Sequence, residues 1–136
     1  MRRLMSSTIL LCLAFIVAAG SGLKAAVSDQ KMKEIGSAFG SLKKNLEAKK
    51  GPEAAADAQK LAALFKNVES FWKGRKAKDA IAFAKGSRKA SLDAAKAAKA
   101  NNFEQTATAV ASLGKNCKGC HEVHREKLPD GTYKTK

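Results

Sequence analysis

Apolar residues recur at helical spacing along the chain after residue 28, and no segment there alternates as a strand would. A first stripe, at intervals of three and four residues, predicts a helix that begins near Ser28 and ends at Gly51-Pro52. Its members are Met32, Ile35, Phe39, Leu42 and Leu46. A second stripe predicts a helix from Pro52 to a cap at Gly74. It comprises Leu61, Leu64, Phe65, Val68, Phe71 and Trp72.

Two further helices are expected in the second half of the chain. The first, over 78–100, is rich in alanine, and its inward face is predicted to hold Ile81, Ala84, Arg88, Leu92 and Ala95. The second opens at Asn101, a predicted cap with Glu104 in the first turn, and ends before Pro129. Its inward face is predicted to hold Phe103, Ala107, Val110, Leu113, Cys117 and Cys120. Helices of about 20 residues with short connections predict an all-α, antiparallel up-down-up-down four-helix bundle over 27–128.

The two ends of the chain differ from this pattern. Arg2 and Arg3 precede an apolar run over 9–17, and small residues follow, so 1–26 is predicted to be a signal peptide for export to a periplasm. A retained anchor helix is the weaker alternative, because the run is shorter than the roughly 20 residues that span a bilayer. Residues 129–136 are expected to form a polar C-terminal tail.

The chain is strongly basic, with 26 lysines and arginines against 12 acidic residues and a formal net charge of +14. Removal of the three basic residues of the signal peptide leaves +11. This charge favours an acidic redox partner protein, with peripheral contact with an anionic membrane surface as an alternative. Nucleic acid is not expected as a partner, because the protein is predicted to be exported and no recognition motif is visible.

Cys117-Lys118-Gly119-Cys120-His121 is the segment with the most specific chemistry. Two cysteines three apart, followed at once by a histidine, form the attachment pattern of c-type haem. Each thiol adds to one vinyl group of the porphyrin, and the adjacent imidazole can bind the iron. The motif therefore predicts one covalently attached haem c, bound through Cys117 and Cys120, with His121 as the proximal iron ligand. The apolar stripes contain many alanines, which fill little volume, so a flat apolar cofactor would also fill space in the core of the bundle.

Three other interpretations of the motif compete with haem attachment. Cys117, Cys120, His121 and His124 could supply four zinc ligands, but a single helix face cannot surround a tetrahedral ion. A thioredoxin-like redox pair belongs at a strand-to-helix junction, and no strand pattern precedes the motif. A plain structural disulfide is the third. No acid–base or nucleophile constellation is visible beyond the motif, so an enzyme is not expected.

The segment Leu113–Arg125 resembles the C-terminal helix of the cytochrome c′ family, which has a Leu-Gly pair before C-x-x-C-H and an arginine four residues after the histidine. The resemblance implies that Arg125 lies near the haem propionates. Position 124, usually aromatic in that family, is here His124. This departure would place a second titratable group beside the haem; the plainer alternative, which we favour, is a partly exposed helix residue. The family includes dimers, so a homodimer is kept as an alternative to a monomer. The region between the first and third predicted helices matches the family poorly.

The segment Met32-Lys33-Glu34-Ile35-Gly36 is similar to a weaker family pattern that faces the distal side of the haem. The resemblance implies two functions. With Met32 as distal iron ligand, the protein would be a low-spin one-electron carrier, because a Met/His pair raises the reduction potential. With Met32 as a steric gate, it would be a five-coordinate, high-spin protein that binds a small diatomic gas such as NO or CO. A flexible core methionine is the plain alternative.

Overall fold

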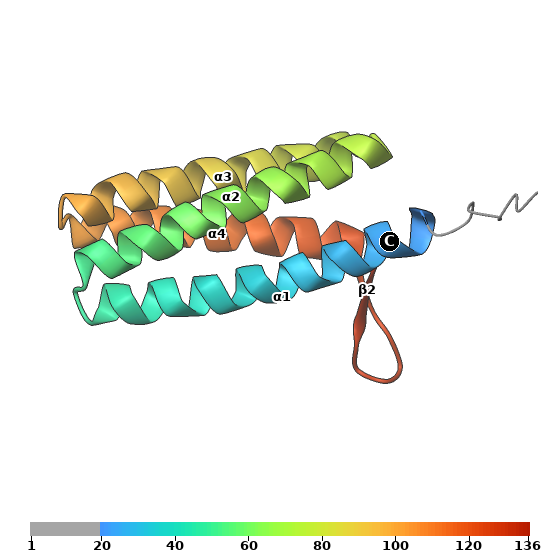
Figure 1. Ribbon diagram of the computed structural model, residues 1–136, viewed down its shortest axis with the longest axis horizontal. Coiled ribbons are helices and arrows are strands. Elements are labelled where there is room, and N and C mark those ends of the chain that lie inside the picture. Colours follow the sequence, from blue (N-terminus) through green and yellow to red (C-terminus); the bar gives the residue numbers. More distant parts are fainter. Residues whose placement is uncertain (1–19) are drawn as a thin grey trace, which may run out of the picture.

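The computed structural model describes the backbone of residues 20–136 and the side chains of residues 29–136. Its helices are α1 (Gly20–Glu47), α2 (Gly51–Arg75), α3 (Lys78–Lys99) and α4 (Phe103–His124), followed by strands β1 (Arg125–Lys127) and β2 (Tyr133–Thr135). Figure 1 shows the four helices side by side, with consecutive helices running in opposite directions. The predicted all-α four-helix arrangement is therefore confirmed, with the addition of a small two-stranded sheet.

Helix α1 is already helical at Gly20, the first described residue, eight residues before the predicted start at Ser28. The predicted signal peptide, residues 1–26, lies mostly outside the described residues, which begin at 20. Among the residues that the structure does describe, no helix carries a stretch long and apolar enough to cross a membrane.

Two helix ends differ from the predicted caps by one or two residues. Gly74 stays inside α2, and Lys76 takes the left-handed position instead, with its backbone N–H donating to the carbonyls of Trp72 and Lys73. At α4 the cap is Asn102, whose Oδ1 accepts from the backbone N–H of Gln105 at 3.0 Å. Asn101 makes the turn, at φ 51°. Asparagine tolerates this conformation better than most residues. Asn101 therefore forms the turn, and Asn102 caps the helix.

The predicted inward face of α3 is only partly correct: Ala84 and Ala95 are buried and Ile81 packs against the core, but the other two positions are not buried. Leu92 is 53% exposed, and Arg88 is only half-buried. The buried face is made of small residues, namely Ala80, Ala84, Ser87, Ala90, Ser91, Ala94, Ala95, Ala97 and Ala98. A stripe of alanine and serine lets the backbones of neighbouring helices approach closely, and a leucine at that interface would hold them apart. The hydroxyl of Ser91 is satisfied by the carbonyl of Ser87 at 2.8 Å.

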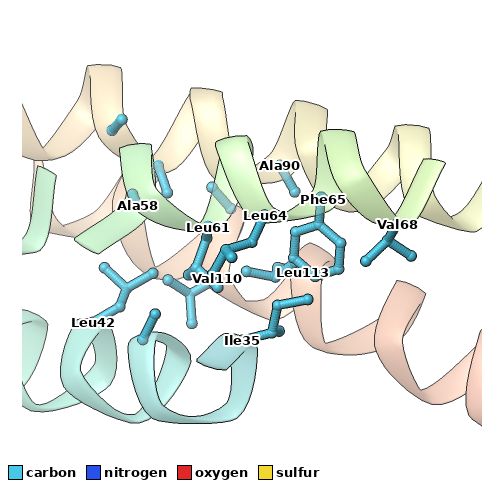
Figure 2. Close-up of a cluster of buried hydrophobic side chains, with 14 of the residues drawn as sticks. Ile35, Leu42, Ala58, Leu61, Leu64, Phe65, Val68, Ala90, Val110 and Leu113 are labelled. Carbon is cyan, nitrogen blue, oxygen red and sulfur yellow. The ribbon is translucent and has the colours of Figure 1, made fainter. Parts of the chain in front are cut away.

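The hydrophobic core lies among all four helices, with its large aliphatic side chains on α1, α2 and α4 and alanines on α3 (Figure 2). Leu42 and Leu61 are fully buried and Leu113 nearly so, as the stripes of the sequence predict. Ala107 is an exception, since it is exposed and its neighbour Thr106 is buried instead. The Thr106 hydroxyl donates to the carbonyl of Asn102 at 2.7 Å, which removes most of the cost of burying it.

The C-terminal segment is a β-hairpin rather than the polar tail predicted over 129–136. Strands β1 and β2 pair antiparallel, with Arg125 opposite Thr135 and Lys127 opposite Tyr133. The turn is held by Asp130, whose Oδ1 accepts from the backbone N–H and the hydroxyl of Thr132 at 2.9 and 2.6 Å. Helix α4 consequently ends at His124, five residues before Pro129, the predicted limit.

Candidate functional site

A cavity of about 750 Å³ opens between α1, the C-terminal half of α4 and the hairpin. This volume lies within the roughly 300–1,000 Å³ of typical cofactor pockets. The apolar part of its wall comes from α1, α2 and α3 and comprises Met32, Ile35, Phe39, Phe65, Val68, Trp72, Phe83 and Ala84. Its polar part is concentrated on α4 and the hairpin. The cavity thus has an apolar body, with most of its titratable groups on α4 and the hairpin and two more, Asp29 and Lys33, on α1.

The cysteine motif lies on the cavity wall, near the end of α4. Cys117 and Cys120 are both half-buried, line the cavity and are not joined by a disulfide. Between them, Gly119 lets Phe83 of α3 pack directly on the helix. A Cβ added at Gly119 would lie 2.6 Å from Cε1 of Phe83, much closer than real Cβ contacts. A side chain at position 119 would therefore displace an aromatic wall of the cavity.

Both thiols are held in their protonated form. Burial raises the pKa of Cys117. Burial and the neighbouring Cys117 raise the pKa of Cys120 to about 11. Redox-active cysteine pairs depend on a lowered pKa that supplies the thiolate. The environment of these cysteines is therefore opposite to that of a thioredoxin-like pair.

His121 is half-buried on the same wall and is held in its neutral form. Removal from water lowers its pKa, and the positive charge of Arg125 lowers it further. A neutral imidazole is the form that binds a metal ion. The burial and the charge around His121 therefore suit a role as an iron ligand.

His124 lies one turn further along α4 and makes two contacts outside its own helix. Its Nε2 lies 2.8 Å from Oδ2 of Asp79, at the start of α3. Its ring centroid lies 4.7 Å from that of Trp72, on α2. The side chain is 16% exposed, so it is partly exposed as predicted, and it ties the ends of α2 and α3 to the end of α4.

The four N/S groups proposed for zinc do not converge. Within the described part of the chain, no three His, Cys, Asp or Glu side chains gather as a metal-binding group. His124 lines the same cavity, but its Nε2 lies 2.8 Å from Oδ2 of Asp79. The zinc interpretation of the motif therefore has no preformed ligand set in this arrangement.

The structure brings the predicted site residues to one cavity, although they are far apart in the sequence. Its lining includes Met32 of α1, the motif residues Cys117, Cys120 and His121, and Arg125 at the start of the hairpin. The sequence reasoning did not single out Phe83, Asp79 or the hairpin. The Asp130-Gly131 pair between two short segments with Tyr and Thr was a usable hairpin signal. Asp79 and Phe83 carried no local signal.

Comparisons with protein-family models, with curated proteins and with solved structures found no match for this chain.

Proposed function

We propose that the cavity holds one covalently attached haem c, and that the protein is a periplasmic carrier of single electrons and not an enzyme. The observation that supports this proposal best is the convergence of a C-x-x-C-H motif and a methionine on one apolar cavity of about 750 Å³. The haem would supply the redox-active iron. The chain would supply its attachment, its ligands and a dry environment.

Each residue of the cavity wall has a role in this proposal. Cys117 and Cys120 form the thioether links, and their protonated thiols suit addition to vinyl groups. His121 binds the iron as the proximal ligand, and Met32 binds it as the distal ligand. Arg125 lies at the cavity wall and balances the charge of the haem propionates. A Met/His pair in an apolar pocket favours a high reduction potential, which suits electron transfer. The basic charge of the chain favours association with an acidic partner protein.

The second candidate function is binding of a small diatomic gas at a five-coordinate iron. It is favoured by the side chains that share the cavity with Met32, namely Ile35, Phe39, Phe65 and Val68. None of these four can bind iron. If Met32 stays off the metal, the distal side is apolar and open to NO or CO.

The optical and EPR spectra of the purified ferric protein distinguish the two functions. The carrier predicts a low-spin spectrum that becomes high-spin in Met32→Ala. A matched control is Leu46→Ala, which shortens another half-buried side chain of the same stripe that is not part of the cavity wall. This control should leave the spin state unchanged. A high-spin wild-type spectrum with rapid CO binding would contradict ligation by Met32 and favour the gas-binding function.

A further inference from the structure

The C-terminal hairpin forms one wall of the cavity. Arg125 of β1 and Thr132, Tyr133, Lys134 and Thr135 around β2 all line it. The hairpin is tethered at both ends, because β1 continues directly from α4 and the backbone N–H of Lys136 donates to the carbonyl of His124 at 2.9 Å. Its side chains are thus held at a fixed place beside the haem-binding motif.

Arg125 has a specific partner on this hairpin. Its guanidinium lies 4.0 Å from the ring centroid of Tyr133, in a cation–π contact. The strand register explains the contact. Arg125 is opposite Thr135 and Lys127 is opposite Tyr133, so Arg125 and Tyr133 are diagonal neighbours on one face of the two-stranded sheet. The face of the ring limits where the guanidinium can lie, without neutralising its charge.

The charge of Arg125 is available to a ligand. No ion pair among residues 29–136 includes this arginine. Lys134, the other cation that the hairpin brings to the cavity, is paired with Glu126 at 3.3 Å. A guanidinium also binds a carboxylate in a planar, bidentate manner, which an ammonium cannot do. Arg125 is therefore the hairpin cation best suited to an anionic group at the cavity.

We propose that Tyr133 is a positioning residue, which holds the Arg125 guanidinium at the cavity wall so that it pairs with a propionate carboxylate of the haem. This inference rests on the proposed haem site and adds the hairpin to it. The only charged groups at the edge of a haem are its two propionates. A guanidinium held beside one of them offsets the negative charge felt at the iron, which disfavours the ferric state. Tyr133 therefore raises the reduction potential through Arg125.

The test compares the reduction potentials of four holoprotein variants with that of the wild type. Arg125→Gln removes the charge and should lower the potential. Tyr133→Leu removes the aromatic face and should shift the potential in the same direction by a smaller amount. Tyr133→Phe keeps the ring and should retain the wild-type potential. In the double variant, Tyr133→Leu should add nothing to Arg125→Gln, because the tyrosine acts only through the arginine.

Covalently bound haem and helical circular dichroism are measured in every sample. An unchanged potential in Tyr133→Leu, or an equal shift by Tyr133→Leu in the Arg125→Gln background, would overturn the role of Tyr133 while leaving the haem site standing. A shift in Tyr133→Phe as large as that in Tyr133→Leu would assign the effect to the hydroxyl and also contradict the proposal. A wild-type protein without covalent haem would overturn the proposed function and this inference together.

Discussion

The two ends of the bundle are built from different side chains. At the end near the turns around residues 49 and 101, here called the packed end, Leu42, Leu61, Ala94 and Ala98 are fully buried. Figure 2 shows Leu42 and Leu61 among the core side chains. At the opposite end, here called the cavity end, the helices carry larger aromatic side chains around an opening of about 750 Å³. Two of these aromatics, Phe39 and Phe83, are only half-buried, whereas Phe65 and Trp72 are buried.

This difference indicates that the packed end mainly stabilises the fold, whereas the cavity end holds the candidate site. Alanine and leucine fill the packed end, where helices approach closely and little space is left. The cavity end keeps apolar surface that the protein alone does not bury, which is costly unless another apolar group covers it. The residues with the most specific chemistry, Cys117, Cys120 and His121, lie at this incompletely packed end. We expect substitutions at the packed end to change stability alone, and substitutions at the cavity end to change the bound group as well.

The largest expected loss of stability is for Leu61→Ala at the packed end. Leu61 has no exposed surface, so its removal leaves a cavity and should lower the free energy of unfolding by about 2–5 kcal/mol. The ferric spectrum should not change. Urea unfolding followed by circular dichroism measures the loss, with Leu92→Ala as an exposed control expected to lie within about 0.5 kcal/mol of wild type. A loss below about 1 kcal/mol for Leu61→Ala would contradict the description of this end.

The next largest loss of stability is expected for Gly119→Ala at the cavity end. The new Cβ would lie 2.6 Å from Phe83, so the ring must move, at a cost of about 1–3 kcal/mol in unfolding free energy. The haem spectrum should change as well, because Phe83 lines the cavity. A smaller side chain in Gly119→Ala/Phe83→Leu should restore part of the stability. Gly74→Ala is the matched control, since nothing lies within 4 Å of its added Cβ. Equal effects of the two Gly→Ala changes would rule out the close contact.

Asp57→Ala should lower the stability moderately, because it removes a hydrogen-bonded contact between α1 and α2. Oδ2 of Asp57 accepts from the Ser41 hydroxyl and from Nδ2 of Asn45, both at 2.7 Å. Loss of both bonds should lower the free energy of unfolding by about 1–2 kcal/mol, with no spectral change. Asp93→Ala is the control, because Asp93 pairs only with the exposed Lys89 on the same helix and should cost less than about 0.5 kcal/mol. If Asp93→Ala cost as much as Asp57→Ala, the link between the helices would not be the cause.

The smallest effect is expected for Asp79→Asn, and it should depend on pH. The hydrogen bond with His124, and then that with the backbone N–H of Ala80, lower the pKa of Asp79 below its usual 3.8. A lowered pKa stabilises the folded state above the unfolded pKa, and this contribution is lost as the pH falls through the folded pKa. Wild type should therefore lose more thermal stability than Asp79→Asn between neutral pH and about pH 3. Parallel melting temperatures of the two proteins over this window would contradict the His124–Asp79 contact.

The sequence predicts the helices well, because their apolar stripes contrast with charged faces. The buried face of α3 is predicted only in part, because nearly every position of this helix is small or charged. Of its two large aliphatic residues, Ile81 packs partly buried against the core, whereas Leu92 lies on the outside. Alanine lies in the core and on the surface alike, so periodicity alone could not select the buried side.

The candidate site was predictable where its residues are contiguous. Cys117, Cys120 and His121 lie within five consecutive positions, so the sequence alone is enough to recognise their shared chemistry. The contact between His124 and Asp79 joins positions 45 residues apart and follows only from how α3 and α4 pack. The hairpin escaped prediction because its strands have three residues each and are mostly exposed, which leaves almost no apolar alternation.

The most direct test of the central claim uses the wild-type chain, expressed in a host that attaches c-type haem to exported proteins. The purified protein is denatured and freed of non-covalent ligands, and its visible absorbance and intact mass are then measured. The account predicts one haem per chain, retained through Cys117 and Cys120 after denaturation. A denatured chain with the mass of the polypeptide alone and no haem absorbance would contradict it.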